Sequence, residues 1–118
     1  MINSQTGGQD ELGSRFFEGT AGKTVMIGTP PVCEAYTTYF NWSNAVIEIP
    51  YDAANVADII AELDARPDHL NRIRKDNLMN SLLRHDWLYR WEQIIEKVGL
   101  NTTPEMLSRK TYLANLAE

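Results

Sequence analysis

Residues 22–31 read GKTVMIGTPP, a short apolar run between turn-forming residues, and this stretch decides the fold expected of the chain. The run at 24–27 is continuous rather than alternating, which is typical of a strand buried on both faces of a parallel sheet. A second β-branched run at 45–49 is closed by Pro50, which has no N–H to donate to a ladder. The two runs predict two parallel strands.

Helical patterns lie on both sides of these runs. Before them, residues 10–22 combine acidic residues at the start with a stripe containing Phe16 and Phe17, and Gly22 fits the end of a helix. Parallel strands need long crossovers and helices on their faces. The expected fold class is therefore α/β, a partial doubly wound (Rossmann-like) parallel sheet with a helical C-terminal region.

Everything beyond residue 51 is predicted to be helical. Pro67 opens a long helix with a weak apolar stripe, Asp86 caps the next helix and Thr103 caps the last one. The helix after Asp86 has the cleanest amphipathic pattern in the chain, and Gly99 suits its end. The stripe of the long helix is Leu70, Ile73, Leu78 and Leu82, and that of the following helix is Trp87, Leu88, Trp91, Ile94, Ile95 and Val98. We expect Trp87 and Trp91 to lie in the core.

The chain of 118 residues is expected to form a single partial domain, residues 1–118, with the first helix and two strands in 10–50 and helices in 51–118. Its net charge of −5 disfavours a sequence-independent nucleic-acid binder. No apolar stretch of transmembrane length is present, and we expect a cytoplasmic protein. Cys33 is the single cysteine and has no His or Cys neighbour at metal-ligand spacing, so no metal site is predicted.

Residues 14–22, SRFFEGTAG, precede the first apolar run and resemble a signature of GT-B glycosyltransferases: an acidic residue, then small residues, then Gly and an apolar strand. The family has a second acidic residue eight positions earlier, where this chain has Asp10. His85-Asp86-Trp87 followed by Arg90 resembles a segment of group-one glycosyltransferase C-terminal domains. The resemblance extends over residues 7–99. It implies the C-terminal half of a GT-B domain that binds a nucleotide sugar, and a transferase activity.

The resemblance assigns Glu18 to the ribose of the donor. A carboxylate accepts hydrogen bonds on two oxygens, which suits the two hydroxyls of a ribose. The turn at Gly8, Gln9 and Asp10 is expected to present backbone N–H groups to the diphosphate or the sugar. Gly28 and Thr29 follow the first strand, at the carboxyl end where open α/β sheets bind ligands. These six residues form the predicted substrate site.

No catalytic residue is assigned. In the family, a basic pair of residues neutralises the charge of the diphosphate, and a separate domain binds the acceptor. Both correspond to sequence before Met1, so we expect the chain alone to be an inactive fragment. The predicted partners are a nucleotide-diphosphate sugar, as substrate rather than cofactor, and either the missing N-terminal acceptor domain or a second copy of the chain. The alternative is a non-catalytic binding or assembly module that dimerises through its strand edge or its C-terminal helices.

Overall fold

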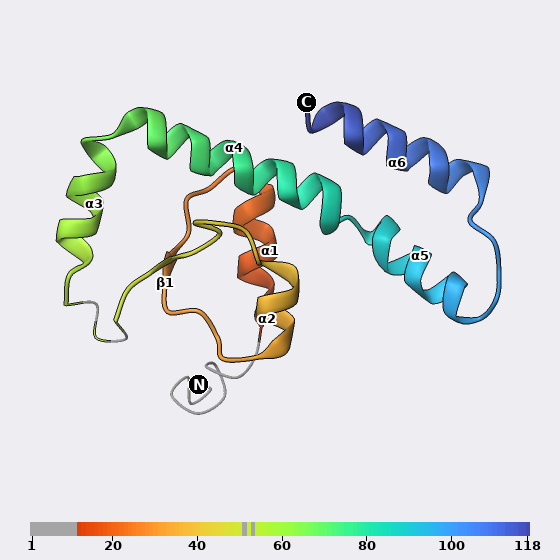
Figure 1. Ribbon diagram of the computed structural model, residues 1–118, viewed down its shortest axis with the longest axis horizontal. Coiled ribbons are helices and arrows are strands. Elements are labelled where there is room, and N and C mark those ends of the chain that lie inside the picture. Colours follow the sequence, from red (N-terminus) through yellow and green to blue (C-terminus); the bar gives the residue numbers. More distant parts are fainter. Residues whose placement is uncertain (1–11, 51, 53) are drawn as a thin grey trace.

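The computed structural model describes residues 12–50, 52 and 54–118 (Figure 1). Within these residues the chain forms six helices and two short strands. In chain order they are α1 (Ser14–Ala21), β1 (Ile27–Gly28), α2 (Glu34–Tyr39), β2 (Ile47–Glu48), α3 (Val56–Asp64), α4 (Pro67–Arg84), α5 (Trp87–Lys97) and α6 (Pro104–Leu116).

The two strands pair in parallel, as predicted, with Ile27 opposite Ile47 and Gly28 opposite Glu48. The N–H of Ile47 donates to the carbonyl of Met26 at 2.8 Å, and that of Ile49 donates to the carbonyl of Gly28 at 3.0 Å. Both strands are shorter than the apolar runs at 24–27 and 45–49 that predicted them. The first begins only at the end of its run.

The predicted fold class is wrong. Helices take up 62% of the described residues, and the sheet within them has only two strands, so this is not a doubly wound, Rossmann-like sheet. The apolar run of β1 predicted burial on both faces, yet Val25, Met26 and Ile27 are only half-buried. Helix α1 packs mainly on α4 rather than on the face of a sheet.

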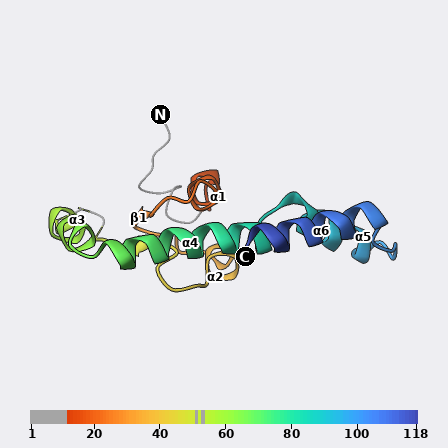
Figure 2. The ribbon, with the colours of Figure 1, turned by 90° about the horizontal axis from the view of Figure 1, so that it is seen from above.

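Helix α4 holds the molecule together, because α1, α3 and α6 all pack against it. Figure 1 shows α3, α4 and α5 following one another across the molecule, after which the chain turns and α6 runs back above α5 toward α4. Viewed at right angles in Figure 2, these four helices form a single layer, with α1 on one side of α4 and α2 on the other. The helices of one layer cover little of one another's surface.

The buried apolar residues of the described part are correspondingly few and widely spread: Phe40, Ala45, Val46, Leu63, Ile73, Leu88 and Leu113. On α4 the buried positions are Ile73, Asn77 and Ser81, one turn apart. The predicted stripe was therefore correct only at Ile73. Leu70, Leu78 and Leu82 are half-buried, because the face that meets α1 carries small and polar side chains.

The helix ends were predicted well. Asp86 caps α5 by accepting the N–H of Leu88, and Thr103 caps α6 by accepting the N–H of Met106. Gly99 follows α5 with φ +81, a left-handed conformation that glycine adopts without strain. The expected burial of Trp87 and Trp91 is wrong, since they are 77% and 57% exposed. None of the described helices has the length and apolar character needed to cross a bilayer.

Candidate functional site

A buried hydroxyl pair fixes helix α1, which carries Phe17 and Glu18, on α4. Thr20 is fully buried, its Oγ1 donates to the carbonyl of Phe16 at 2.9 Å, and it accepts a hydrogen bond from Ser81 Oγ at 2.8 Å. Gly19 makes the next contact, where the flexible side chain of Met26 packs directly on the glycine: a Cβ there would lie 2.1 Å from Met26 Sδ and would displace that side chain. These contacts fix the side of α1 that Phe17 and Glu18 share.

The junction between α4 and α5 supplies the opposite side of the site. His85 ends α4, and its ring lies 5.0 Å from Phe17 and 4.9 Å from Phe40, centroid to centroid. Its Nε2 donates to the carbonyl of Tyr39 at 2.7 Å, which fixes the tautomer because a carbonyl only accepts. Burial lowers the pKa of His85 below its ordinary 6.5, and the charges of Arg90 and Arg84 act in the same direction against the opposing Tyr39 bond.

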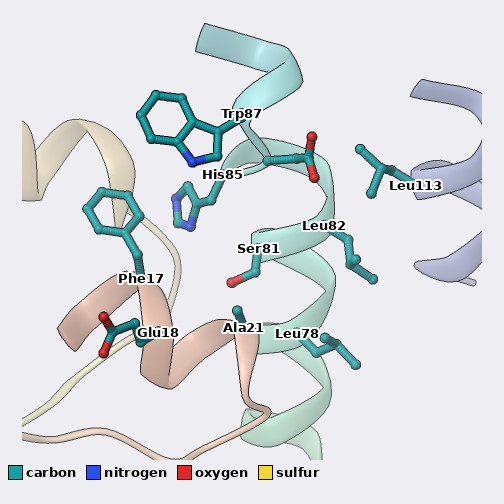
Figure 3. Close-up of a pocket in the computed structure, with 10 residues that line it drawn as sticks. Phe17, Glu18, Ala21, Leu78, Ser81, Leu82, His85, Trp87 and Leu113 are labelled. Carbon is teal, nitrogen blue, oxygen red and sulfur yellow. The ribbon is translucent and has the colours of Figure 1, made fainter. Parts of the chain in front are cut away.

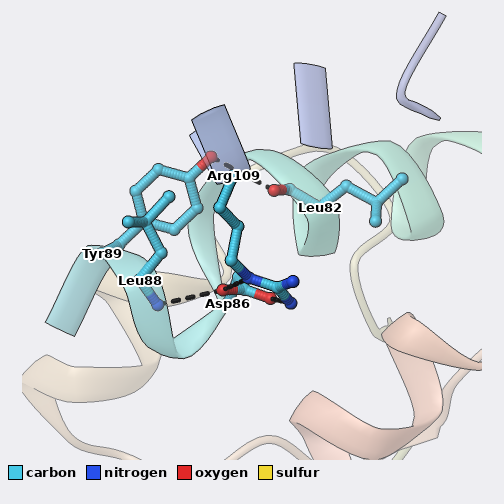
Figure 4. Close-up of polar contacts among 5 residues, drawn as sticks. All are labelled: Leu82, Asp86, Leu88, Tyr89 and Arg109. Atoms are coloured by element: carbon cyan, nitrogen blue, oxygen red, sulfur yellow. Dashed lines mark hydrogen bonds and ion pairs between the residues drawn. The ribbon is translucent and has the colours of Figure 1, made fainter. Parts of the chain in front are cut away.

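Asp86, the next residue, ties α5 to α6 (Figure 4). Its carboxylate accepts the N–H of Leu88 at 3.0 Å and two bonds from Arg109, from Nε at 2.9 Å and from Nη2 at 2.6 Å. The hydrogen bond from Arg109 holds the pKa of Asp86 below its usual range. Burial acts to raise this pKa, and the hydrogen bond from the Leu88 N–H acts to lower it. The carboxylate is thus already engaged and belongs to the framework of the site.

Three adjoining cavities meet between α1, the α4–α5 junction and α6, with volumes of about 360, 450 and 480 Å³. The first is lined mainly by apolar side chains, Phe17, Leu78, Leu82 and Leu113 among them (Figure 3). The largest is lined by Ser14, Phe17, Glu18, His85, Trp87 and Arg90. In Figure 3 the carboxylate of Glu18 points away from Ser81, and the aliphatic part of the Glu18 side chain lies on the side of Ser81.

The structure separates the predicted substrate residues. Glu18 is exposed and lines two of the cavities. Gly28 and Thr29 line neither of these two cavities, and Thr29 Oγ1 donates to the carbonyl of Ile49 at 2.8 Å, which extends the contact between the strands. Gly8, Gln9 and Asp10 lie outside the described residues.

The structure adds Trp87 and Arg90 to the neighbourhood of Glu18. Arg90 lies over the ring of Tyr39 at 4.4 Å from its centroid and donates to the carbonyl of Arg84 at 3.4 Å. The sequence contained a signal for both residues, since they belong to the second segment of the glycosyltransferase resemblance. That segment was interpreted as structural, because the helical spacing of Trp87 and Trp91 favoured a buried stripe.

Among the residues that the structure describes, there is no group of three or more His, Cys, Asp or Glu side chains that could hold a metal ion. Cys33 is a free, half-buried thiol at the start of α2. Comparison with known proteins gives no family model, curated protein or solved structure that matches the chain.

Proposed function

We propose that the chain binds a nucleotide-diphosphate sugar beside Glu18 and serves as the donor-binding portion of a glycosyltransferase. One observation carries the proposal. The two segments that resemble glycosyltransferases, around Glu18 and from His85 to Arg90, are far apart in the sequence and line one cavity. Their proximity is what a shared donor site requires, and it is brought about by the packing of α1 on α4. The cavity's volume of about 480 Å³ lies within the ordinary range for small-ligand sites.

The side chains around the cavity suit the parts of such a donor. Glu18 offers a carboxylate to the ribose hydroxyls, once its exposed side chain rotates toward the cavity, a motion of picoseconds to nanoseconds for such residues. Arg90 offers a permanent positive charge for the diphosphate and has donors beyond the one that bonds Arg84. The apolar walls around Phe17 accommodate an uncharged part of the ligand. The acceptor and the chemical step require residues elsewhere, in another part of the enzyme, and we propose the cytoplasm as the compartment.

Calorimetric titration of the 118-residue chain with UDP-glucose, GDP-mannose and ADP-glucose tests this proposal. Glu18→Gln should weaken binding of the best ligand by roughly 10- to 150-fold, because hydrogen bonds to a charged acceptor are lost and an amide donor replaces one oxygen. Glu62→Gln is the matched control, since Glu62 is exposed on α3 and lines none of the three cavities. Absence of binding by the wild-type chain, or equal affinities of wild type and Glu18→Gln, contradicts the proposal.

A second candidate function is assembly through the C-terminal helices. On α5, Trp91, Ile94 and Val98 are all at least half exposed and lie at helical spacing on one face. Exposed apolar side chains that share one helix face are a candidate surface for association with a second copy of the chain. The strand edge is a weaker candidate, because strands of two residues offer few free hydrogen-bonding groups. Sedimentation of the wild type and of Ile94→Lys tests assembly through α5. A wild-type dimer that the substitution dissociates supports this function, and a monomeric wild type contradicts it.

A further inference from the structure

Trp87 has an environment that its sequence pattern did not predict. Its side chain is 77% exposed, although it is the first residue of the most amphipathic helix in the chain. Of the residues that the structure describes, it is also the one that lines all three adjoining cavities. Figure 3 shows its indole beside His85, on the side of the cavity where Phe17 lies. A large aromatic surface therefore stands open where the cavities meet.

The backbone on either side of Trp87 is held in place. His85 packs among Phe17, Phe40 and Trp42 and bonds the carbonyl of Tyr39. Asp86 accepts bonds from Leu88 and Arg109. On a fixed backbone only the two side-chain torsions of a tryptophan are left to be ordered when a flat ligand stacks on it, so the entropic cost of stacking is small.

Resting on the donor site proposed above, we infer that Trp87 is the platform on which the nucleobase of the bound nucleotide stacks. The base is the flat, aromatic part of a nucleotide sugar, and every base has a π-face that stacks on an indole. The positions of the charged groups agree with this orientation. With the base on Trp87, the ribose and the diphosphate have Glu18 and Arg90 on the walls of the same cavity.

Trp91 provides a matched control for this inference. It is on the same helix one turn later and is also more than half exposed, but of the three cavities described above it lines just the one between α5 and α6. Neither Glu18 nor Arg90 lines that cavity. Removal of the two indoles should therefore have similar effects on solubility and folding and different effects on nucleotide binding.

The test is calorimetric titration of the full chain and its Trp87→Ala, Trp87→Phe and Trp91→Ala variants with UDP-glucose, GDP-mannose and, as base-free probe, inorganic pyrophosphate. Trp87→Ala should weaken binding of the nucleotide sugar by roughly 5- to 150-fold, the range found for base–aromatic stacking, whereas Trp87→Phe should retain most of the affinity. Pyrophosphate binding should be equal in all four proteins. Thermal melts establish that the variants are folded.

The outcomes separate the inference from the proposed function. If the wild type binds a nucleotide sugar and Trp87→Ala binds it equally well, the stacking inference is overturned while the donor site stands. Equal losses in Trp87→Ala and Trp91→Ala, or a loss that extends to pyrophosphate, also overturn it, since the effect is then not stacking of the base. If the wild type binds no nucleotide sugar, both the proposed function and the inference fail.

Discussion

The contact between α1 and α4 and the contact between α5 and α6 are built in opposite ways. The first buries polar groups that satisfy one another: Thr20 and Ser81 share a hydrogen bond and have almost no exposed surface. The second leaves apolar groups such as Trp91 and Val98 open to solvent and is tied by ion pairs near the surface, between Asp86 and Arg109 and between Glu92 and Lys110. The amphipathic pattern of a helix thus does not determine how much of it is covered.

The difference follows from what each helix has beside it. Helix α4 lies in the middle of the molecule, with α1 on one side and α2 on the other (Figure 2), and two of its polar residues, Asn77 and Ser81, are buried. Among the described elements, helix α5 packs mainly on α6, and Trp91, Ile94 and Val98 beside this contact remain at least half exposed. The comparison predicts that replacing a buried polar residue of α4 by alanine destabilises the chain more than replacing an exposed apolar residue of α5 by alanine.

The largest effect is expected at Asn77, which is fully buried. Its Oδ1 accepts from Trp42 Nε1 at 2.9 Å and its Nδ2 donates to the carbonyl of Thr24 at 2.8 Å. Asn77→Ala leaves both partners unsatisfied, at about 1–3 kcal/mol each, so the free energy of unfolding should fall by roughly 2–6 kcal/mol. Urea denaturation measures it. Asn71→Ala, at an exposed position of the same helix, should change it by less than about 0.5 kcal/mol, and similar losses in both variants contradict the prediction.

A smaller loss is expected at the cap of α5. Asp86→Ala removes the acceptor of the Leu88 N–H, and loss of an N-cap costs about 0.5–2 kcal/mol. Asp86→Asn keeps an acceptor of similar quality and should preserve most of the stability, although it removes the charge that faces Arg109. Helicity by circular dichroism and urea midpoints distinguish the two variants. If Asp86→Asn is as destabilised as Asp86→Ala, the ion pair rather than the cap carries the effect.

The sequence predicted what depends on neighbours along the chain. Asp86, Gly99 and Thr103 act within one helical turn, so their residue types sufficed to locate the helix ends. Asn77 and Ser81 are buried by partners that lie far away in the sequence, and polar residues in a weak helical pattern carry no signal of such partners. At the candidate site, Glu18 was recognised from a motif. Trp87 was assigned to the core because helical periodicity identifies an apolar face without identifying what covers it.

Stability should also depend on pH through His85, at the junction of the two regions. Because its pKa in the folded chain lies below 6.5, the unfolded chain takes up a proton first as the pH falls. The contribution of His85 is therefore fully present above 6.5 and is lost as the pH falls through the folded pKa. Protonation would also place a donor on Nδ1, which is buried without a hydrogen-bond partner in the described part of the chain.

His85→Gln tests this dependence, since a glutamine does not titrate and its amide can still donate to the carbonyl of Tyr39. Urea midpoints from about pH 8 to about pH 5 should decrease more steeply for the wild type than for the variant. Parallel slopes for the two proteins would mean that His85 has the same proton affinity in the folded and unfolded chain. A steeper slope in His85→Gln would reverse the sign of the argument.

The smallest effect is expected at Trp91, where the interpretations from sequence and from structure differ most. A core tryptophan costs roughly 3–5 kcal/mol when it is replaced by alanine. Because 57% of the Trp91 side chain is exposed, less apolar surface is lost from the interior, and Trp91→Ala should reduce the free energy of unfolding by only about 1 kcal/mol. Urea denaturation at a low and a high protein concentration measures the cost and shows whether it depends on association. A small cost at both concentrations agrees with an open α5, and a cost that rises with concentration means that a second copy covers this face. A cost of roughly 3–5 kcal/mol at both concentrations, with a chain that sediments as a monomer at both, contradicts the exposure of Trp91, because burial within one chain then explains the loss.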